Sequence, residues 1–245
     1  MSTLPVFLVD HLPTNDDAVL DGPEGRHAAT VRRLRAGEAL VLSDGRGGLA
    51  RCVVRAVWRD SVGLMVERRW AEPPASPRVV LAQALVKGER GELAVELATE
   101  AGVDEVVPWR AERCVARWED GPRGDKALAR WRGSAREAAK QARRAWCPVV
   151  QPPVHTAGLA GLVSSVELAL VLHESADRGL VGVPLPAAGD VLLVVGPEGG
   201  ITDAELDVLC SAGAVPVRLG RTVLRASTAA AVALGALGAL TERWQ

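Results

Sequence analysis

The chain has 245 residues, a hydrophobic content of 48%, a charged content of 24% and a formal net charge of −1. This balance is typical of a globular protein with one large or two small domains, and the near-zero charge argues against nonspecific binding of polyanions. The apolar run over residues 229–240 is too short, and too rich in Ala and Gly, to span a bilayer. We see no signal-peptide pattern and expect a cytoplasmic protein without a membrane partner.

Cysteine and histidine are too scattered to form a metal or redox motif. The cysteines show no CxxC spacing, and the histidines show no ligand pairing. We therefore expect no bound metal and plain thiols in a reducing compartment.

The first part of the chain, up to about residue 70, has the pattern of short strands. Its segment ALVLSDGRGGLARCVVRAVWRDSVGLMVERRW holds three alternating apolar runs separated by turn-forming stretches. Such strands predict a small β-barrel. The proline-rich segment AEPPASP at 71–77 reads as a linker, so we expect one domain over residues 1–72 and a second over residues 73–245.

After residue 78 the pattern changes to strands that alternate with helices. Strand candidates are RVVLAQALV, VDEVVP, ELALVLHE, DVLLVVG and VPVRLG. One helix is expected over 90–101 with Leu93, Leu97 and Ala101 on its apolar face and Gly102 as its stop. Another is expected from Asp125 to residue 146, with Trp131 and Trp146 as core residues, and two more from Thr202 and about Arg225. This α/β alternation predicts a mainly parallel sheet with helices on both faces.

Three of the expected strands end in unusual segments, at 172–174, 196–200 and 219–225. In open α/β sheets, ligands bind beyond the carboxyl ends of the strands. The sequence Gly-Pro-Glu-Gly-Gly at 196–200 would let main chain approach a ligand closely, and Thr202 can form a capping box with Glu205. An ordinary strand-to-helix connection remains the alternative. Because GxGxxG and GxxxxGK[ST] are both missing, the loop suits a nucleoside better than a triphosphate.

Several motifs, in order along nearly the whole chain, resemble the bacterial 16S rRNA uridine-N3 methyltransferases of the SPOUT class. They are RHAATVRRLRAGEAL, LVKGERGELAVELATEAGVDEVVPWRAERC, REAAKQARR, LVVGPEGGITDAEL and VRLGRTVLRASTAA. The resemblance implies a PUA-like amino-terminal barrel, a carboxyl-terminal α/β domain whose mainly parallel sheet contains a trefoil knot, and a homodimer. It also implies S-adenosylmethionine as cofactor and methylation of N3 of one uridine in 16S rRNA of the small ribosomal subunit.

Carried over by position, the resemblance assigns the cofactor pocket to the three strand-end segments and the start of the last helix. These residues are Leu172, His173, Glu174, Gly196, Pro197, Glu198, Gly199, Gly200, Leu219, Gly220, Val223, Leu224, Arg225 and Thr228. Two positions depart from the family pattern: Ser227 stands where Glu is usual, and Lys140 stands where the family has EAAEQ.

Two residues are candidates for the chemistry. The proton on uridine N3 must leave, and negative charge on the uracil oxygens must be stabilised. We expect Arg225 to stabilise that charge, although a local role at the helix start remains open. Glu198 could accept the proton, but we favour a geometric role in its turn and hypothesise no dedicated base.

Clusters of basic residues provide candidate contacts to RNA phosphates. One lies near the start of the chain and one between Arg123 and Arg144, and each alone could be a solvated face. The predicted RNA-contact residues are Arg26, His27, Arg32, Arg33, Lys87, Arg90, Arg113, Lys140, Gln141 and Arg144. Alternatives are a knotted methyltransferase for another rRNA or tRNA site and a noncatalytic RNA-binding assembly factor; a nicotinamide-dependent oxidoreductase is disfavoured because the dinucleotide fingerprint is missing.

Overall fold

A computed structural model describes residues 4–244, and their contacts divide the described chain into two compact units. The first unit holds the residues up to 74 together with residues 139–147, and the second holds the remainder. We expected the whole stretch from residue 73 in one domain. Segment 139–147 differs because Lys140 Nζ binds the Glu24 carboxylate at 2.8 Å, and Trp146 Nε1 donates to the Glu72 carbonyl at 2.9 Å.

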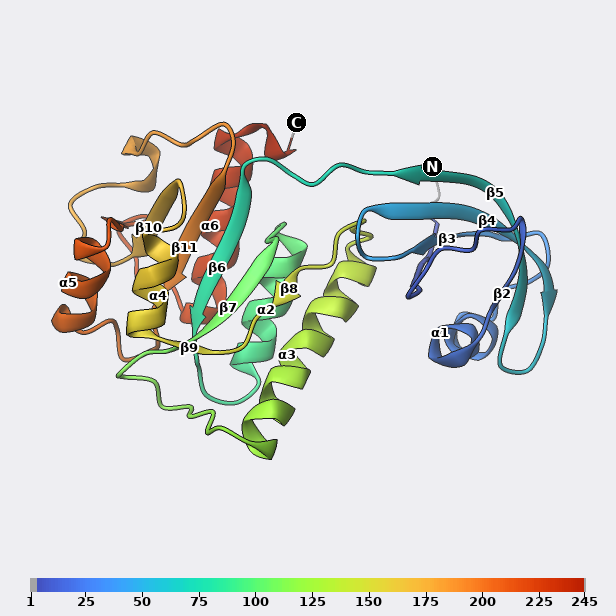
Figure 1. The fold of residues 1–245 in the computed structure, drawn as a ribbon, viewed down its shortest axis with the longest axis horizontal. Helices are drawn as coiled ribbons and strands as arrows, with labels where there is room; N and C mark the ends of the chain where they lie inside the picture. The colour runs from blue at the N-terminus through green and yellow to red at the C-terminus, as the bar shows by residue number, and fades with distance from the viewer. Residues whose placement is uncertain (1–3, 245) are drawn as a thin grey trace. The chain divides into compact units, whose positions relative to one another are not determined.

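Within the described residues, the first unit is built on a five-stranded sheet with the order β1-β3-β4-β5-β2 (Figure 1). Its strands are β1 (Val6–Leu8), β2 (Asp17–Leu20), β3 (Ala39–Ser43), β4 (Gly48–Val57) and β5 (Val62–Ala71). The three expected apolar runs are therefore β3, β4 and β5, joined as an antiparallel meander, whereas β1 pairs with β3 in parallel. A short helix α1 (Gly22–Arg26) continues into a π-helical turn η1 (His27–Val31). Phe7, Leu40 and Leu64 are fully buried in this unit's core.

The second unit contains a parallel sheet with the order β12-β10-β11-β6-β7-β8, and β9 pairs with β7. Its strands are β6 (Arg78–Ala84), β7 (Glu105–Arg110), β8 (Val149–Val150), β9 (Val154–His155), β10 (Leu168–Leu172), β11 (Asp190–Val195) and β12 (Val215–Val217). All pairings between them are parallel. The nearly continuous apolar runs of β6, β10 and β11 are explained by burial on both faces, which confirms the expected parallel sheet.

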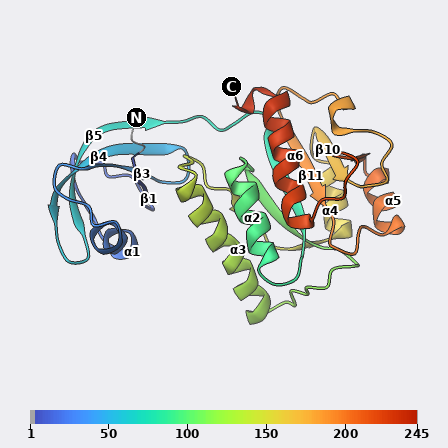
Figure 2. The same cartoon turned by 180° about the vertical axis from the view of Figure 1, so that it is seen from behind.

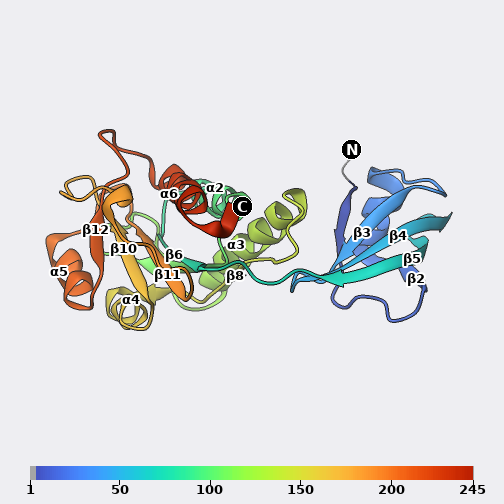
Figure 3. The same ribbon diagram turned by 90° about the horizontal axis from the view of Figure 1, so that it is seen from above.

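Helices cover both faces of this sheet. They are α2 (Arg90–Glu100), α3 (Pro122–Gln141), α4 (Thr156–Val163), α5 (Asp203–Ser211) and α6 (Ala226–Leu240), with short 3₁₀ turns η2 (Leu180–Gly182) and η3 (Glu242–Trp244). Figure 3 shows α2 and α6 on one face and α4 and α5 on the other. Seen from behind in Figure 2, α6 lies beside α2, and the two helices pack against each other.

The apolar face expected for α2 is wrong. Leu93 is 42% exposed, whereas the buried side of the helix consists of Gly91, Ala94, Val95, Ala98 and Thr99. Small residues are buried here because α2 packs closely against the Ala- and Gly-rich α6, and a close helix pair excludes long side chains. The expected stop is confirmed: α2 ends before Gly102, which has a φ of +101°.

The bounds expected for α3 are also corrected. The helix begins at Pro122, before Asp125, and ends at Gln141 because Arg143 adopts a left-handed φ of 56°. The Arg144 N–H then bonds the Ala139 carbonyl, a hydrogen bond that closes the helix end. Trp131 is 2% exposed, as expected for a core residue, but Trp146 lies beyond the helix in the first unit.

Between residues 4 and 244, no helix is both long and apolar enough to cross a membrane. Over the same range, His, Cys, Asp and Glu side chains do not gather in groups of three or more that could hold a metal ion.

Candidate functional site

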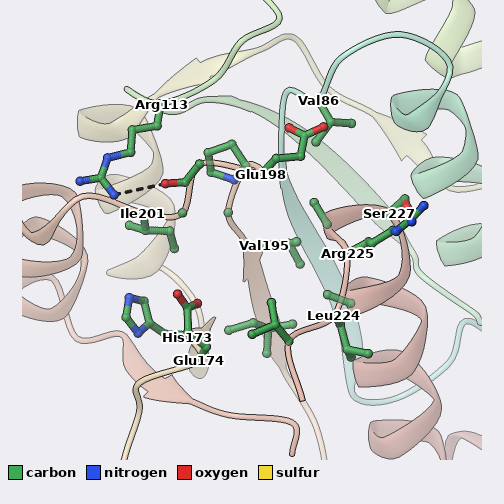
Figure 4. A pocket seen from close by; sticks show the side chains of 18 of the residues that line it. Val86, Arg113, His173, Glu174, Val195, Glu198, Ile201, Leu224, Arg225 and Ser227 are labelled. Carbon is green, nitrogen blue, oxygen red and sulfur yellow. Dashed lines mark hydrogen bonds between the residues drawn. The ribbon is translucent and has the colours of Figure 1, made fainter. Parts of the chain in front are cut away.

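A cavity of about 530 Å³ lies at the carboxyl ends of the central strands of the parallel sheet. The segments after β10 and β11 and the start of α6 form its walls, together with Val86, which follows β6 (Figure 4). Because parallel strands all end on the same edge, residues far apart in sequence meet here. A smaller cavity of about 80 Å³ adjoins it, since both are lined by Leu172, His173 and Glu174.

The loop over 196–200 requires glycine at two positions. A Cβ on Gly196 would lie 2.7 Å from Ile201 Cγ1, which is closer than side-chain atoms can approach. Gly200 has a φ of +77°, a backbone conformation that other residues adopt only with strain. At its glycines the loop therefore presents main-chain atoms to the cavity, as the sequence suggested, while the Glu198 side chain also lines it.

The far end of this loop is held by the buried carboxylate of Glu205. Thr202 caps α5 and forms the expected capping box with Glu205. Oε1 of Glu205 accepts hydrogen bonds from the Glu112 N–H at 2.9 Å and from Thr156 Oγ1 at 3.0 Å, while Oε2 accepts from the Thr202 N–H at 3.2 Å. One carboxylate thus ties the loop over 196–200 to two other segments of the unit.

Of the charged side chains around the cavity, some have partners within the protein and others do not. Glu198 lies 3.7 Å from Arg90, and the Arg113 guanidinium donates to the Gly199 carbonyl at 3.2 Å. Arg225 is exposed at the N-cap of α6 and, among the described residues, has no carboxylate within ion-pair distance. In Figure 4, His173 and Glu174 stand across the cavity from Arg225 and Ser227. The guanidinium of Arg225 is therefore available to a ligand's negative charge.

Two buried thiols, Cys52 and Cys114, are unsuited to nucleophilic chemistry. Burial raises the pKa of Cys114, which lies near this site, above its ordinary value. Burial also raises the pKa of Cys52 to about 11. Because the thiolate is the reactive form, both groups remain unreactive at neutral pH.

The first unit contains a separate small cavity with a basic lining. It encloses about 140 Å³, and its walls are formed by Pro5, Val6, Phe7, His27, Arg32, Lys140, Gln141 and Arg143. The Lys140 amine is engaged by Glu24 and His27 Nδ1. The other cations of this cavity, Arg32 and Arg143, have no carboxylate partner within the described chain. This group can attract an anion.

The chain resembles known proteins in both sequence and structure. The sequence model for an RNA methyltransferase domain matches residues 73–238, and that for an RNA methyltransferase PUA domain matches residues 20–62. The chain belongs to this RNA methyltransferase family. Its relatives include proteins named ribosomal RNA small subunit methyltransferase E. The one from Mycobacterium bovis is 55% identical over 98% of this chain and 93% of its own, and the one from Bacillus subtilis is 30% identical over 91% and 90%.

The fold of this RNA methyltransferase also matches a solved relative. A Legionella pneumophila protein, solved in complex with the bound cofactor SAM, has a TM-score of 0.85 and 28% identity, and the match covers 98% of each chain. The expected architecture, an α/β unit with a parallel sheet preceded by a PUA-like unit, is therefore confirmed.

The structure brings most of the residues assigned to the cofactor together. Eleven of them line the larger cavity: Leu172, His173, Glu174, Gly196, Pro197, Glu198, Gly199, Gly200, Val223, Leu224 and Arg225. Leu219 and Gly220 line the adjoining smaller cavity, whereas Thr228 lines neither of these two.

The residues assigned to RNA in this RNA methyltransferase are distributed over three places. Arg90 and Arg113 line the larger cavity, and Lys87 lines a different cavity of the second unit. His27, Arg32, Lys140 and Gln141 line the small cavity of the first unit. Arg26, Arg33 and Arg144 line none of these three, and Arg26 pairs with Asp60 at 3.3 Å.

Sequence reasoning missed several lining residues. They are Val86, Val195, Ile201, Ala226, Ser227 and Ala229. The apolar members carry no local signal, because only the fold reveals that their side chains face a cavity. Ser227 had a signal, since the sequence resemblance singled it out as a departure, and it is 5% exposed at the start of α6.

Proposed function

We propose that this enzyme transfers the methyl group of S-adenosylmethionine to N3 of a specific uridine in 16S rRNA of the small ribosomal subunit. The observation that carries the proposal is the cavity whose walls are glycine main chain at strand ends, in a chain 55% identical to a ribosomal RNA small subunit methyltransferase E. Membership of the family supports methyl transfer to RNA. The choice of uridine and of its N3 atom rests on the sequence resemblance.

The residues of the cavity fit S-adenosylmethionine. Its volume of about 530 Å³ lies within the range of about 300–1,000 Å³ that small-molecule sites occupy. Apolar walls from Leu172, Val195 and Leu224 suit an adenine ring, and the main-chain groups of 196–200 suit its edge and the ribose. The carboxylates of Glu174 and Glu198 are available to a cationic group. Bound there, the cofactor supplies a methyl group activated by a positively charged sulfur.

The protein's contribution to the reaction is alignment and charge stabilisation. Arg225 stands at the cavity without a carboxylate partner among the described residues, so its guanidinium can stabilise negative charge on the uracil oxygens as the N3 proton leaves. Glu198 faces Arg90 at 3.7 Å, which supports the geometric role that we favour for it. No dedicated base is needed in this scheme, and the imide proton passes to solvent.

The remaining parts of the proposal concern the RNA and the assembly. The PUA-like unit and the predicted RNA-contact residues other than Lys140, whose amine binds Glu24, hold the rRNA, the basic ones by its phosphates. The chain passes through a trefoil knot at the cofactor loops, an arrangement compatible with the strand order β12-β10-β11-β6 and with α6 returning to pack on β6 and β11. Two copies form a homodimer, in keeping with the exposed apolar side chains of Val232 and Leu240 on α6. The enzyme works in the cytoplasm, where small subunits are assembled.

The test uses small ribosomal subunits from a bacterial strain that lacks the corresponding methyltransferase. Incubation with the purified chain and isotopically labelled S-adenosylmethionine should label 16S rRNA, and mass mapping should find one uridine with the methyl on N3. A label on another rRNA or on tRNA would show that the enzyme acts on that RNA and not on the proposed substrate. If no transfer occurs although calorimetry detects cofactor binding, the alternative of a noncatalytic RNA-binding assembly factor replaces the proposal.

Variants at the cavity separate the two proposed roles. Arg225→Gln should lower kcat about 100-fold, the usual cost of losing one donor to a developing anion, while the cofactor Kd changes only a few-fold. Glu198→Gln should retain transfer within about tenfold if its role is geometric. A loss of several orders of magnitude in Glu198→Gln, with normal cofactor binding, would instead identify Glu198 as the proton acceptor.

A further inference from the structure

A second cavity of about 410 Å³ opens beside the cofactor cavity in the second unit. It lies between the loop after β6, the start of α2, the segment 116–119 and the first turns of α3. Val86 lines both cavities, so they are neighbours on the same edge of the sheet. We call it the tryptophan cavity, because Trp118 and Trp131 are both in its wall.

The two tryptophans form a rigid aromatic wall. Their ring centroids are 4.8 Å apart and the rings are inclined at 77°, an edge-to-face contact. Trp131 is 2% exposed and packs so closely on α2 that a Cβ at Gly91 would lie 2.8 Å from its indole nitrogen. Trp118 is only partly buried. Its ring therefore offers a surface to a ligand while Trp131 holds it from behind.

The rest of the wall is basic, and most of its cations are unpaired. Four cationic side chains line the cavity against two carboxylates, Glu92 and Glu119. Arg130 pairs with Glu92 at 2.8 Å. In contrast, Lys87, Arg117 and Arg123 are exposed, and none lies within ion-pair distance of a carboxylate in the described chain. Their charge is free to meet an anion from outside.

An aromatic surface beside unpaired cations is the combination that binds single-stranded nucleic acid: bases stack on the rings and phosphates meet the charges. We propose that the tryptophan cavity binds a nucleotide that flanks the target uridine, with its base stacked on Trp118 and its phosphates at Lys87, Arg117 and Arg123. This inference rests on the proposed function, because it places that nucleotide on the strand whose uridine enters the neighbouring cavity. A base displaced from its helix is selected partly through such flanking nucleotides, so this cavity contributes to the choice of substrate.

Variants of Trp118 test the stacking contact. Trp118→Leu keeps an apolar group against Trp131 but removes the stacking ring, whereas Trp118→Phe keeps a ring. We expect Trp118→Leu to raise the KM for small ribosomal subunits about tenfold with little change in kcat, and Trp118→Phe to remain within about threefold of the unchanged chain. The cofactor Kd, measured by calorimetry, and the thermal midpoint should be the same in all three proteins.

Variants of the basic residues test the phosphate contacts. In the chain with Lys87→Gln, Arg117→Gln and Arg123→Gln together, the salt dependence of binding to a short single-stranded RNA should weaken, with the slope of log K against log salt smaller by about 2. Lys126→Gln is the matched control. Lys126 is an exposed cation on α3, three residues after Arg123, and does not line the cavity, so its removal should leave the slope nearly unchanged.

The outcomes separate this inference from the proposed function. If the unchanged chain methylates the small subunit but Trp118→Leu shows the same KM and the triple variant the same salt slope, the tryptophan cavity does not bind RNA. If the unchanged chain methylates no small-subunit RNA, yet single-stranded RNA binding depends on Trp118 and on the three cations, the cavity is retained and the proposed substrate is lost. A triple variant that lowers the slope no more than Lys126→Gln contradicts the phosphate contacts.

Discussion

The sharpest prediction concerns Glu205, which anchors the glycine loop of the cofactor cavity. Its carboxylate is 6% exposed and accepts hydrogen bonds from Glu112, Thr156 and Thr202. Glu205→Gln keeps the size of the side chain but replaces one accepting oxygen with an NH₂ donor. In the unchanged chain the Glu112 N–H bonds Oε1 and the Thr202 N–H bonds Oε2. The one carbonyl oxygen of the glutamine cannot accept from both. Hydrogen bonds to a charged group contribute about 1.5–3 kcal/mol, so the loss of one and the weakening of others should cost about 2–4 kcal/mol.

Urea denaturation followed by tryptophan fluorescence measures the loss of stability. Calorimetry measures the affinity for the cofactor. We expect the free energy of unfolding to fall by about 2–4 kcal/mol and the affinity for S-adenosylmethionine to fall with it, because the loop that begins at Gly196 loses its anchor at Thr202. Asp203→Asn is the control, since Asp203 is exposed in the same first turn of α5. If Glu205→Gln were no less stable than Asp203→Asn, the reasoning that a buried carboxylate holds the loop would be refuted.

Three further predictions follow from local geometry. Gly196→Ala places a methyl 2.7 Å from a neighbouring side chain and should weaken cofactor binding at least tenfold in calorimetry, whereas Gly161→Ala, which meets open space, should not. Lys140→Met leaves the largely buried Glu24 carboxylate without its partner, so the free energy of unfolding, measured in urea, should fall by about 3 kcal/mol. Adding Glu24→Gln should recover most of this loss. Equal losses in the single and double variants would contradict the pairing. Burial raises the pKa of Cys52 from 9.0 to about 11, so the stability that its protonated thiol contributes is fully present below pH 9 and is lost as the pH rises to 11. In Cys52→Ala the urea midpoint should therefore fall less between these pH values than in the unchanged chain.

The parallel sheet and its ligand edge were predictable because their causes are local. Continuous apolar runs mark strands buried on both faces, and the run of β11 ends in Gly-Pro, which marks the end of that strand. The capping box of Thr202 and Glu205 could be read from spacing alone, and the structure forms it. Most of the cofactor residues followed once strand ends were placed on one edge.

The features that the sequence did not reveal depend on contacts between distant residues. The buried face of α2 consists of small residues, and a periodicity search that weights Leu over Ala selects the opposite face. Lys140 was predicted to contact RNA because of its charge, but its amine lies against Glu24, which is 116 positions away in the chain. Trp118 was not among the predicted RNA-contact residues because nothing in the sequence distinguishes it from the other tryptophans. Its edge contact with Trp131 and the surrounding cations are visible only in the structure.

The assignment of residues 139–147 to the first unit has a consequence for how the protein is made. Translation delivers the strands of that unit early, but Lys140 and Trp146 leave the ribosome only after the intervening segment 75–138 of the other unit has been synthesised. Until then Glu24 lacks its cation and the Glu72 carbonyl lacks its indole donor. The amino-terminal unit therefore cannot complete its folding on the nascent chain before residues 139–147 have been synthesised. A fragment that ends at residue 74 would lack part of this unit, and its folding would be incomplete for that reason.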